Sequence, residues 1–468
     1  MSRSLLNGFL PEGTSPEKKS KEQSSNLNMK MMNRIHKIFA ALFLILSVSI
    51  SYGQELLTVD EAVSLALKNN FDVELAQKKI QQAQLNTDKK NTGLLPTVTA
   101  SGGANYQIGT FWGKPPNLDT YKKISRAGTQ NYNASVGANY LLYDGNFRKY
   151  NWEKLKIFYH LSEIEAQALY ERTALSVHTA YYQIAKLKSI LAILQSTMDV
   201  SKHRLKRAEV GVEFGKESGL SVLNAQVDIN NDSLKIQNTQ LQISNAKRNL
   251  NSLLGRDLSI DFDVVTDVNY LTGMTEEQLI EDATERNTQI KAINRNIKLS
   301  ELDLKMAKAG YKPTVRLSAS YGGSFVAQPG GFFDKQVSLG LGAGLQVSWN
   351  IFDGGRTKIK EQNAIIDQET NLLRKQQIEY NLESDVRTKW ANYQNALSTL
   401  EFQQVNIQTA QANFDRTKER FSAGQISSVE FRQAQLGLLN AQSIYQQAKY
   451  DAKLAELGLL LVSGHLVE

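Results

Sequence analysis

The chain has 468 residues, with 7 prolines and no cysteine. This length suggests two or three globular domains, and the lack of cysteine excludes a disulfide framework or a thiolate metal site. The formal net charge of +7 is modest, so the composition gives no reason to expect nucleic acid as a partner.

Residues 1–53 are predicted to be an N-terminal extension and signal peptide. Arg34 and Lys37 precede an apolar run over 38–50, and small residues then fit cleavage after Gly53. The run is short for a bilayer span, although an N-terminal membrane anchor is the alternative. Whether residues 1–30 are translated stays open. We expect an exported protein, and without a cysteine at the cleavage site it is not a lipoprotein.

In the rest of the chain, one sequence pattern occurs twice. TVDEAVSLALKNN, from Thr58, aligns with TEEQLIEDATERN, from Thr275, and GLLPTV aligns with GYKPTV, at a constant offset of 217 residues. LLYDGN then aligns with NIFDGG at an offset of 209, so the first copy has 8 more residues, which we assign to the loop between its two strands. A repeat of this kind decides the fold before any local motif.

Each copy is predicted to run helix, strand, strand, long helix and returning helix. The first copy spans 54–273, with strands at about 96–109 and 131–143, a long helix at about 145–212 and a returning helix at about 219–254. The second spans 274–468, with strands at about 313–326 and 335–352, a long helix at about 355–422 and a returning helix at about 427–463.

The predicted strands alternate apolar with small polar residues. In the fourth strand one face carries Val337, Leu339, Leu341, Ala343, Leu345, Val347 and Trp349, opposite glycine, serine and glutamine. Such alternation over roughly 10 residues fits a tilted membrane strand with its apolar face in lipid. A soluble sheet with one buried face is the alternative, and the export signal favours the membrane.

Four strands cannot close a membrane barrel, and open sheet edges are not tolerated in lipid. The chain is therefore expected to supply part of a larger barrel. Three copies would give 12 strands.

The long helices carry a seven-residue repeat. The first has apolar residues at Tyr170, Val177, Ile184, Leu191, Met198, Leu205 and Val212, and Ser201 is the one polar member of a second row. A strict repeat of seven indicates left-handed coiled-coil packing. The alternatives are a rod or a soluble bundle, but a helix joined directly to a membrane strand favours a tube that projects from a barrel.

No motif in the sequence points to catalysis. GLGAG at 340–344 lies within a predicted strand, so it is not a dinucleotide-binding loop, and the five histidines form no ligand-spaced pair. We therefore predict that the protein is not an enzyme and uses no cofactor or metal.

The doubled pattern resembles the outer membrane efflux protein family, the TolC-like exit ducts, over about residues 54–464. LTVDEAVSLALKNN, GLLPTV, GYKPTV, LLYDGN, NIFDGG and the two helical turns carry the resemblance. It implies a mainly α-helical chain with a membrane β-barrel, assembled as a homotrimer. A 12-stranded β-barrel in the outer membrane would continue as a 12-helix α-barrel into the periplasm. Pro96, Gly145, Pro313 and Gly354 would mark the joints between strands and helices.

The resemblance also implies a tip that coiled helices keep closed. A periplasmic adaptor and an inner-membrane pump, of RND or ABC type, would open it. Acidic residues after the second turn ring the pore constriction in the family. Glu430 matches that position, and Gln433 stands where some members have a second acid. A helix N-terminal acid favoured by the helix dipole is an equally good explanation of Glu430.

The glycines and serines of the two turns have an ordinary capping explanation as well. From their position we expect the adaptor contacts to be Gly215, Lys216, Ser218, Gly424, Gln425 and Ser427. The leading hypothesis is a passive exit duct of a tripartite efflux or type I secretion system in a Gram-negative outer membrane. The rivals are a structural periplasmic coiled coil, such as the adaptor itself, and an exported enzyme.

Overall fold

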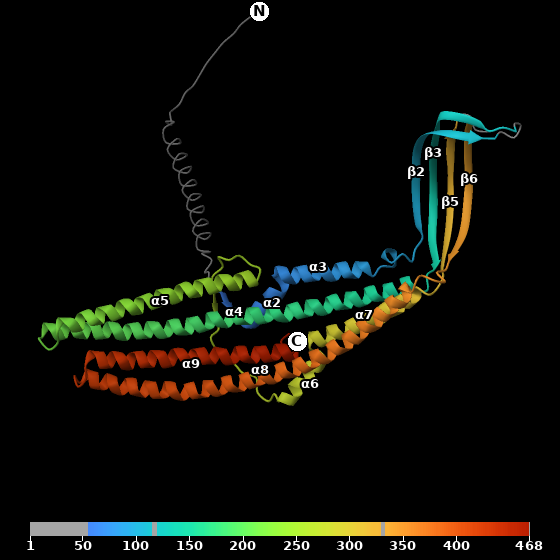
Figure 1. Ribbon diagram of the computed structural model, residues 1–468. Coiled ribbons are helices and arrows are strands. Elements are labelled where there is room, and N and C mark those ends of the chain that lie inside the picture. Colours follow the sequence, from blue (N-terminus) through green and yellow to red (C-terminus); the bar gives the residue numbers. More distant parts are fainter. Residues whose placement is uncertain (1–54, 115–118, 329–332, 468) are drawn as a thin grey trace, which may run out of the picture. The chain divides into compact units, whose positions relative to one another are not determined.

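The computed structural model describes residues 55–114, 119–328 and 333–467 (Figure 1). The predicted signal peptide and its cleavage after Gly53 lie outside the described residues. Across the described ranges, no helix is both long and apolar enough to cross a bilayer.

Four long strands form one antiparallel sheet in the order β2-β3-β5-β6. They are β2 (Thr97–Gly113), β3 (Lys122–Tyr143), β5 (Thr314–Ala327) and β6 (Lys335–Ser348). The register pairs Ser101 with Ser135, Ser135 with Gly322, and Gly322 with Gly340. The small polar residues of all four strands therefore share one face, and among the residues described here β2 and β6 each have one edge without a partner strand.

The assignment of the 8 extra residues of the first copy to a loop was wrong, because they lengthen the strands. β2 continues to Gly113 and β3 already begins at Lys122, so 8 residues separate these strands, and 7 separate β5 from β6. The register shifts between Gly109 and Phe111. A slip of one residue moves the following side chains to the opposite face, so the alternation could not be followed past that point.

Two very long helices follow the two hairpins. They are α4 (Phe147–Glu213) and α8 (Arg356–Ser422), each of 67 residues. Each turns back as a shorter helix, α5 (Gly219–Leu253) and α9 (Ser428–Ser463). The remaining elements are the helices α2 (Val59–Asn69), α3 (Phe71–Asn86), α6 (Glu276–Arg286) and α7 (Thr288–Ala309), the short helix η1 (Lys89–Asn91), and the paired strands β1 (Glu55–Leu57) and β4 (Phe262–Val264).

Each strand passes into its long helix through two left-handed residues. Gly145 and Asn146 have φ of 71° and 74°, and Gly354 and Gly355 have φ of 69° and 85°. The aspartate before each pair caps the helix, since Asp144 accepts from the backbone N–H of Arg148 at 3.1 Å. Such φ values favour glycine and asparagine, which explains the Asp-Gly-Asn and Asp-Gly-Gly sequences.

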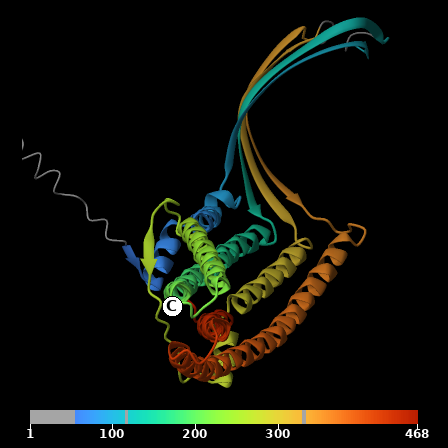
Figure 2. The ribbon, with the colours of Figure 1, turned by 90° about the vertical axis from the view of Figure 1, so that its left-hand side faces the viewer.

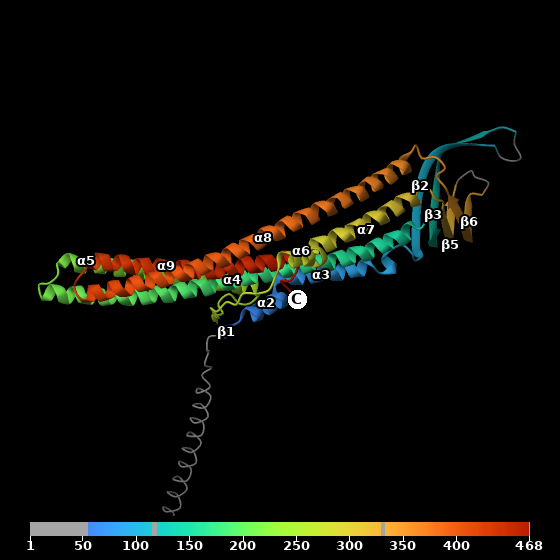
Figure 3. The same ribbon diagram turned by 90° about the horizontal axis from the view of Figure 1, so that it is seen from below.

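The helices lie side by side in two sets, which Figures 1 and 3 both show. Near the sheet the order is α3, α4, α7, α8, and towards the far turns it is α5, α4, α9, α8. Thus α3 and α5 share one position and α7 and α9 another. Figure 2 views the same helices nearly along their axes.

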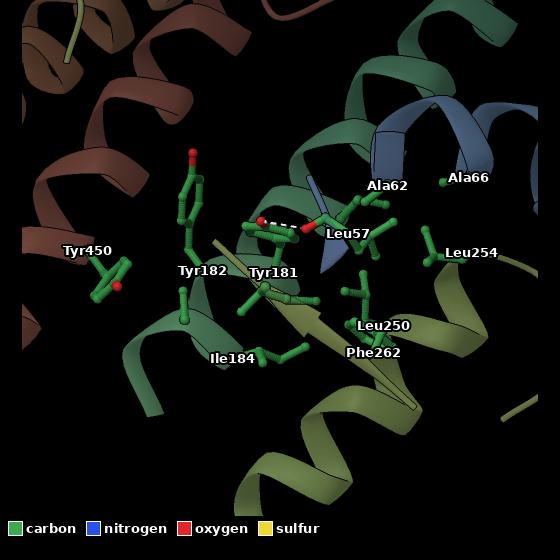
Figure 4. Packing of buried hydrophobic residues seen from close by; sticks show 14 of the residues in the cluster. Leu57, Ala62, Ala66, Tyr181, Tyr182, Ile184, Leu250, Leu254, Phe262 and Tyr450 are labelled. Carbon is green, nitrogen blue, oxygen red and sulfur yellow. Dashed lines mark hydrogen bonds between the residues drawn. The ribbon is translucent and has the colours of Figure 1, made fainter. Parts of the chain in front are cut away.

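The largest core lies where α2 and the β1–β4 pair cover α4 (Figure 4). Leu57 packs on α4 beside Tyr181, whose hydroxyl donates to the carbonyl of Leu57 at 2.9 Å and accepts from the N–H of Val265 at 3.0 Å. A second core places Leu279 of α6 against Val386 of α8. Val177 and Val386, both from the seven-residue repeat, are fully buried in these cores.

The segment that joins the two copies is hydrogen-bonded to α9. The hydroxyl of Tyr270 donates to the carbonyl of Lys449 at 2.7 Å, and the N–H of Leu271 donates to the carboxylate of Glu456 at 3.0 Å. Glu456 is fully buried and also accepts from Lys453 Nζ at 2.5 Å. These bonds hold α9 in place midway along the helices, far from its turn with α8.

Candidate functional site at the helical tips

The turns of the two helical hairpins lie beside each other at the end remote from the sheet. Arg207 of α4 donates to the carbonyl of Ser422, at the end of α8, at 3.0 Å. Its guanidinium also lies 4.7 Å from the centre of the Phe421 ring. The two hairpins are thus in direct contact where they turn.

All six residues predicted as adaptor contacts are exposed at this end: Gly215, Lys216, Ser218, Gly424, Gln425 and Ser427. A groove of about 680 Å³ runs between the two turns, and both glycines at the turns are left-handed, with φ of 68° and 73°. An added Cβ at either glycine would meet no atom within 4 Å. The turns therefore present an open surface.

Glu430, predicted at a pore constriction, forms a capping box with Ser427. Its Oε2 accepts from the N–H and hydroxyl of Ser427 at 2.8 and 3.0 Å, and the hydroxyl of Ser427 accepts from the N–H of Glu430 at 3.2 Å. The bond from the backbone and then that from the hydroxyl hold the pKa of Glu430 below its usual value. These contacts match the capping explanation of Glu430, while Gln433 lies exposed one turn further along α9.

A buried polar cluster, not predicted from the sequence, lies next to the tips. Arg432 of α9 donates two hydrogen bonds to Asp232 of α5, at 2.9 and 2.8 Å. Ser201 of α4 donates to the same carboxylate at 2.8 Å, and Gln435 of α9 donates to the carbonyl of Thr197 at 2.8 Å. We call Ser201, Asp232, Arg432 and Gln435 the tip clasp. It joins α4, α5 and α9.

The tip clasp is a charged pair with almost no access to water. The side chains of Arg432 and Asp232 are 10% and 1% exposed. Burial on its own would raise the pKa of Asp232, but the hydrogen bonds from Arg432 and Ser201 and the charge of Arg432 outweigh it and lower the pKa. Asp228 lies beside the clasp, paired with Arg204.

The four predicted joint residues lie at the boundary between sheet and helices. Pro96 and Pro313 immediately precede β2 and β5, and Gly145 and Gly354 separate β3 and β6 from the long helices. Among the residues that the structure describes, no group of three histidine, cysteine or acidic side chains could hold a metal ion.

The sequence and the fold of this chain are similar to those of known proteins. The sequence matches the family model described as outer membrane efflux protein over residues 62–256 and 279–465. It is similar to the probable outer membrane lipoprotein SilC of Salmonella typhimurium, with 22% identity over 87% of this chain and 85% of the relative. The pyoverdine export outer membrane protein OpmQ of Pseudomonas aeruginosa also shares 22% identity over 87% of this chain and 85% of its own.

Solved structures share the fold. The Campylobacter jejuni CmeC outer membrane channel superimposes with a TM-score of 0.71 at 16% identity, over 88% of this chain and 86% of that channel.

Proposed function

The chain belongs to the outer membrane efflux protein family, and on that basis we propose that it is the exit duct of a tripartite efflux or type I secretion system. It is a passive channel in the outer membrane of a Gram-negative bacterium, extends into the periplasm and catalyses no reaction. A periplasmic adaptor and an inner-membrane pump of RND or ABC type supply the energy and the opening signal. One observation carries the proposal: within the described part of the chain, a sheet with two unpaired edges continues directly into helices whose outer flanks are also unpaired.

The unpaired edges support assembly as a homotrimer. At each level one edge belongs to the first copy of the unit (54–273) and the other to the second (274–468). Two edges of this kind join head to tail and form a ring when the rotation closes. Because each copy brings two strands and two helix positions, three chains give a 12-stranded β-barrel and a 12-helix α-barrel. Closure also removes the open sheet edges, which lipid does not tolerate.

Apolar rows on the outer helices fit this closure. On α5, Leu220, Val227, Leu234 and Leu241 are seven residues apart and 56–64% exposed. On α8, Ile359, Ile366, Leu373 and Tyr380 are also seven apart and 57–77% exposed. Coiled-coil packing buries rows of this spacing, so we assign both rows to contacts between neighbouring chains.

The tip clasp supports a closed resting tip. It fixes α9 of the second hairpin to α4 and α5 of the first within one chain, so the two hairpins cannot separate while it is intact. We assign adaptor docking to the exposed turns around Gly215 and Gly424. Glu430 and Gln433 are the candidates for the constriction behind them.

Conductance in planar lipid bilayers tests this function. The purified protein should insert as a trimer and give a low, steady conductance, which should rise when Asp232→Asn breaks the clasp. In cells, deleting the gene should abolish export by its pump, and the intact gene should restore it. Extraction of the protein without detergent would contradict the proposal and favour a structural periplasmic coiled coil.

A further inference from the structure

The positive charge of the chain is concentrated beside the sheet. The segments 86–96, 144–156, 298–316 and 353–361 flank the four joints between strands and helices. Together they hold 14 lysines and arginines and 7 aspartates and glutamates. Residues 54–468, which follow the predicted signal peptide, hold 47 lysines and arginines and 44 aspartates and glutamates, so outside these four segments the acidic residues are in excess. The excess thus needs an explanation specific to this level of the molecule.

In these segments, several side chains form a cluster around Trp152 of α4. The indole Nε1 donates to the carbonyl of Thr87, at the end of α3, at 2.7 Å. Lys156 Nζ lies 3.5 Å from the centre of the indole ring, and Lys89 Nζ lies 5.2 Å from it. Cation–π attraction of this kind holds two ammonium groups against one aromatic ring. The cluster therefore has a defined position and a defined charge.

Two further lysines stand close by in the chain: Lys90 follows Lys89 in η1, and Lys149 lies three residues before Trp152 in α4. They and the two lysines against the ring are all exposed. In the described part of the chain none of the four makes an ion pair. We call Trp152 with Lys89, Lys90, Lys149 and Lys156 the Trp152 patch. It is a set of exposed lysines around an amphipathic ring, with Asp88 as a neighbouring acid, which accepts from the N–H of Lys90 at 2.9 Å.

The distance of the Trp152 patch from the sheet, and the face of α4 on which it lies, both fit a site at the membrane interface. Trp152 comes five residues after the start of α4, about 8 Å along the helix at 1.5 Å per residue. This is close to the thickness of one headgroup layer, about 5–8 Å. Lys149 and Lys156 precede Val177 by whole multiples of seven residues, so they lie on the face of α4 that α2 covers further down.

We propose that the Trp152 patch binds the phosphate of an anionic glycerophospholipid in the periplasmic leaflet of the outer membrane. The proposal rests on the proposed function, because it requires the sheet to span that membrane. Lysines close to an anionic surface attract it individually, and tryptophan favours the headgroup level. The lysines would surround the phosphate, while the indole fixes two of them and shields their stems. The patch would set the depth of the channel in the bilayer.

Tryptophan quenching by brominated lipids tests this directly. The chain has four tryptophans, at 112, 152, 349 and 390, so a variant that keeps only Trp152 reports on the patch. Its full-length trimer is reconstituted in phosphatidylethanolamine vesicles containing brominated phosphatidylglycerol or brominated phosphatidylcholine. We expect stronger quenching by phosphatidylglycerol. Lys156→Gln should lower the apparent affinity for it about fivefold, and added salt should weaken it.

Replacing all four lysines of the patch by glutamine should make the two lipids equally effective. A charge-matched variant, with glutamine at Lys202, Lys206, Lys235 and Lys418 towards the tips, should keep the preference for phosphatidylglycerol. Equal quenching by both lipids in the unmodified patch would overturn the proposal. So would a preference that inorganic phosphate abolishes, or a response of Trp152 to purified adaptor and not to lipid.

A second reporter separates this proposal from the proposed function. A variant that keeps only Trp349, which directly follows β6, should be quenched by both lipids alike, because the face of β6 that it continues is expected to contact lipid. If neither lipid quenches Trp349, the sheet is not in the membrane and the proposed function fails. If both quench Trp349 while Trp152 shows no preference, only the lipid site fails.

Discussion

Asn70 donates a hydrogen bond from its side chain to the backbone carbonyl of Leu253 at 2.9 Å, and so ties the end of α5 to the start of α3. The same side chain caps α3, because its Oδ1 accepts from the N–H of Asp72 at 2.9 Å. Asn287 does the same in the second copy, donating to the carbonyl of Val462 at 2.9 Å. One asparagine per copy therefore joins two helices end to end.

Asn70→Ala and Asn287→Ala should each lower the free energy of unfolding by about 1–2 kcal/mol, through the lost cap and the unpaired carbonyl. Thermal unfolding of the detergent-solubilised protein measures the loss. Asn69→Ala, at the exposed neighbouring position, is the control and should have little effect. An equal loss for Asn69→Ala would show that the tie between helices is not the cause.

Gly255, directly after α5, should tolerate alanine much less well than the tip glycine does. Gly255 and Gly215 have nearly the same φ, 63° and 68°. A Cβ at Gly255 would lie 2.3 Å from the carbonyl oxygen of Asn69, while one at Gly215 meets nothing within 4 Å. Gly215→Ala should cost about 1–2 kcal/mol for the left-handed conformation alone, and Gly255→Ala about 1–3 kcal/mol more for the clash. Similar losses of unfolding temperature would refute the clash.

Breaking the tip clasp should open the channel. Arg432→Met leaves Asp232 charged and buried, which should cost about 3–5 kcal/mol locally and raise conductance in planar bilayers. The double variant Arg432→Met with Asp232→Leu removes both charges and should recover part of the closed state. Arg416→Gln, on an exposed face of α8, is the charge control and should leave conductance unchanged.

The order of helices and strands could be predicted from the sequence because the sequence pattern occurs twice. The tip clasp could not be predicted, because each of its two charged residues occurs in only one of the two copies. At the offset of 209, Arg432 corresponds to Leu223 and Asp232 to Ala441, so no repeat marks either charge. The two residues are 200 positions apart, and only the packing of α5 against α4 and of α4 against α9 brings them together. The available signal was Ser201, the single polar residue in an otherwise apolar row.

At the tips, too, the sequence predicts the turns but not the contact between the two helical hairpins. The turns at Gly215 and Gly424 follow from local chemistry, since a left-handed residue ends each long helix. Contact between the two hairpins, through Arg207 and Phe421, depends on how the copies pack and leaves no local pattern. The longer strands of the first hairpin were missed because the register shift near Gly109 breaks the alternation.

Acidification should destabilise the protein through His178 of α4. Burial, and then the charge of Lys453, lower the pKa of His178 to about 4 from 6.5. Folding therefore keeps this ring neutral, and the stability that depends on it is complete above pH 6.5 and is lost as the pH falls towards 4. The full loss is about 3 kcal/mol per chain. His178→Gln should flatten the decline in unfolding temperature over this range, while His203→Gln, at an exposed site, should not.

Charges in the apolar row of α5 should dissociate the trimer. Leu234→Glu with Leu241→Glu places two carboxylates in the proposed contact between chains, and native mass spectrometry should then show monomers. Leu258→Glu, at a residue 55% exposed beyond the end of α5, is the control and should leave the trimer intact. A trimer unaffected by the double variant would exclude this row from the interface.

The equal length of α4 and α8, 67 residues each, has a consequence for how such a chain can evolve. Adding one turn to either helix alone would shift its tip by about 5 Å relative to the other and pull the tip clasp apart. Insertions and deletions in the long helices are therefore tolerated only in matched pairs, one in each copy. The strand hairpins carry no such constraint, and the segment from Pro96 to Asp144 is 8 residues longer than the one from Pro313 to Asp353.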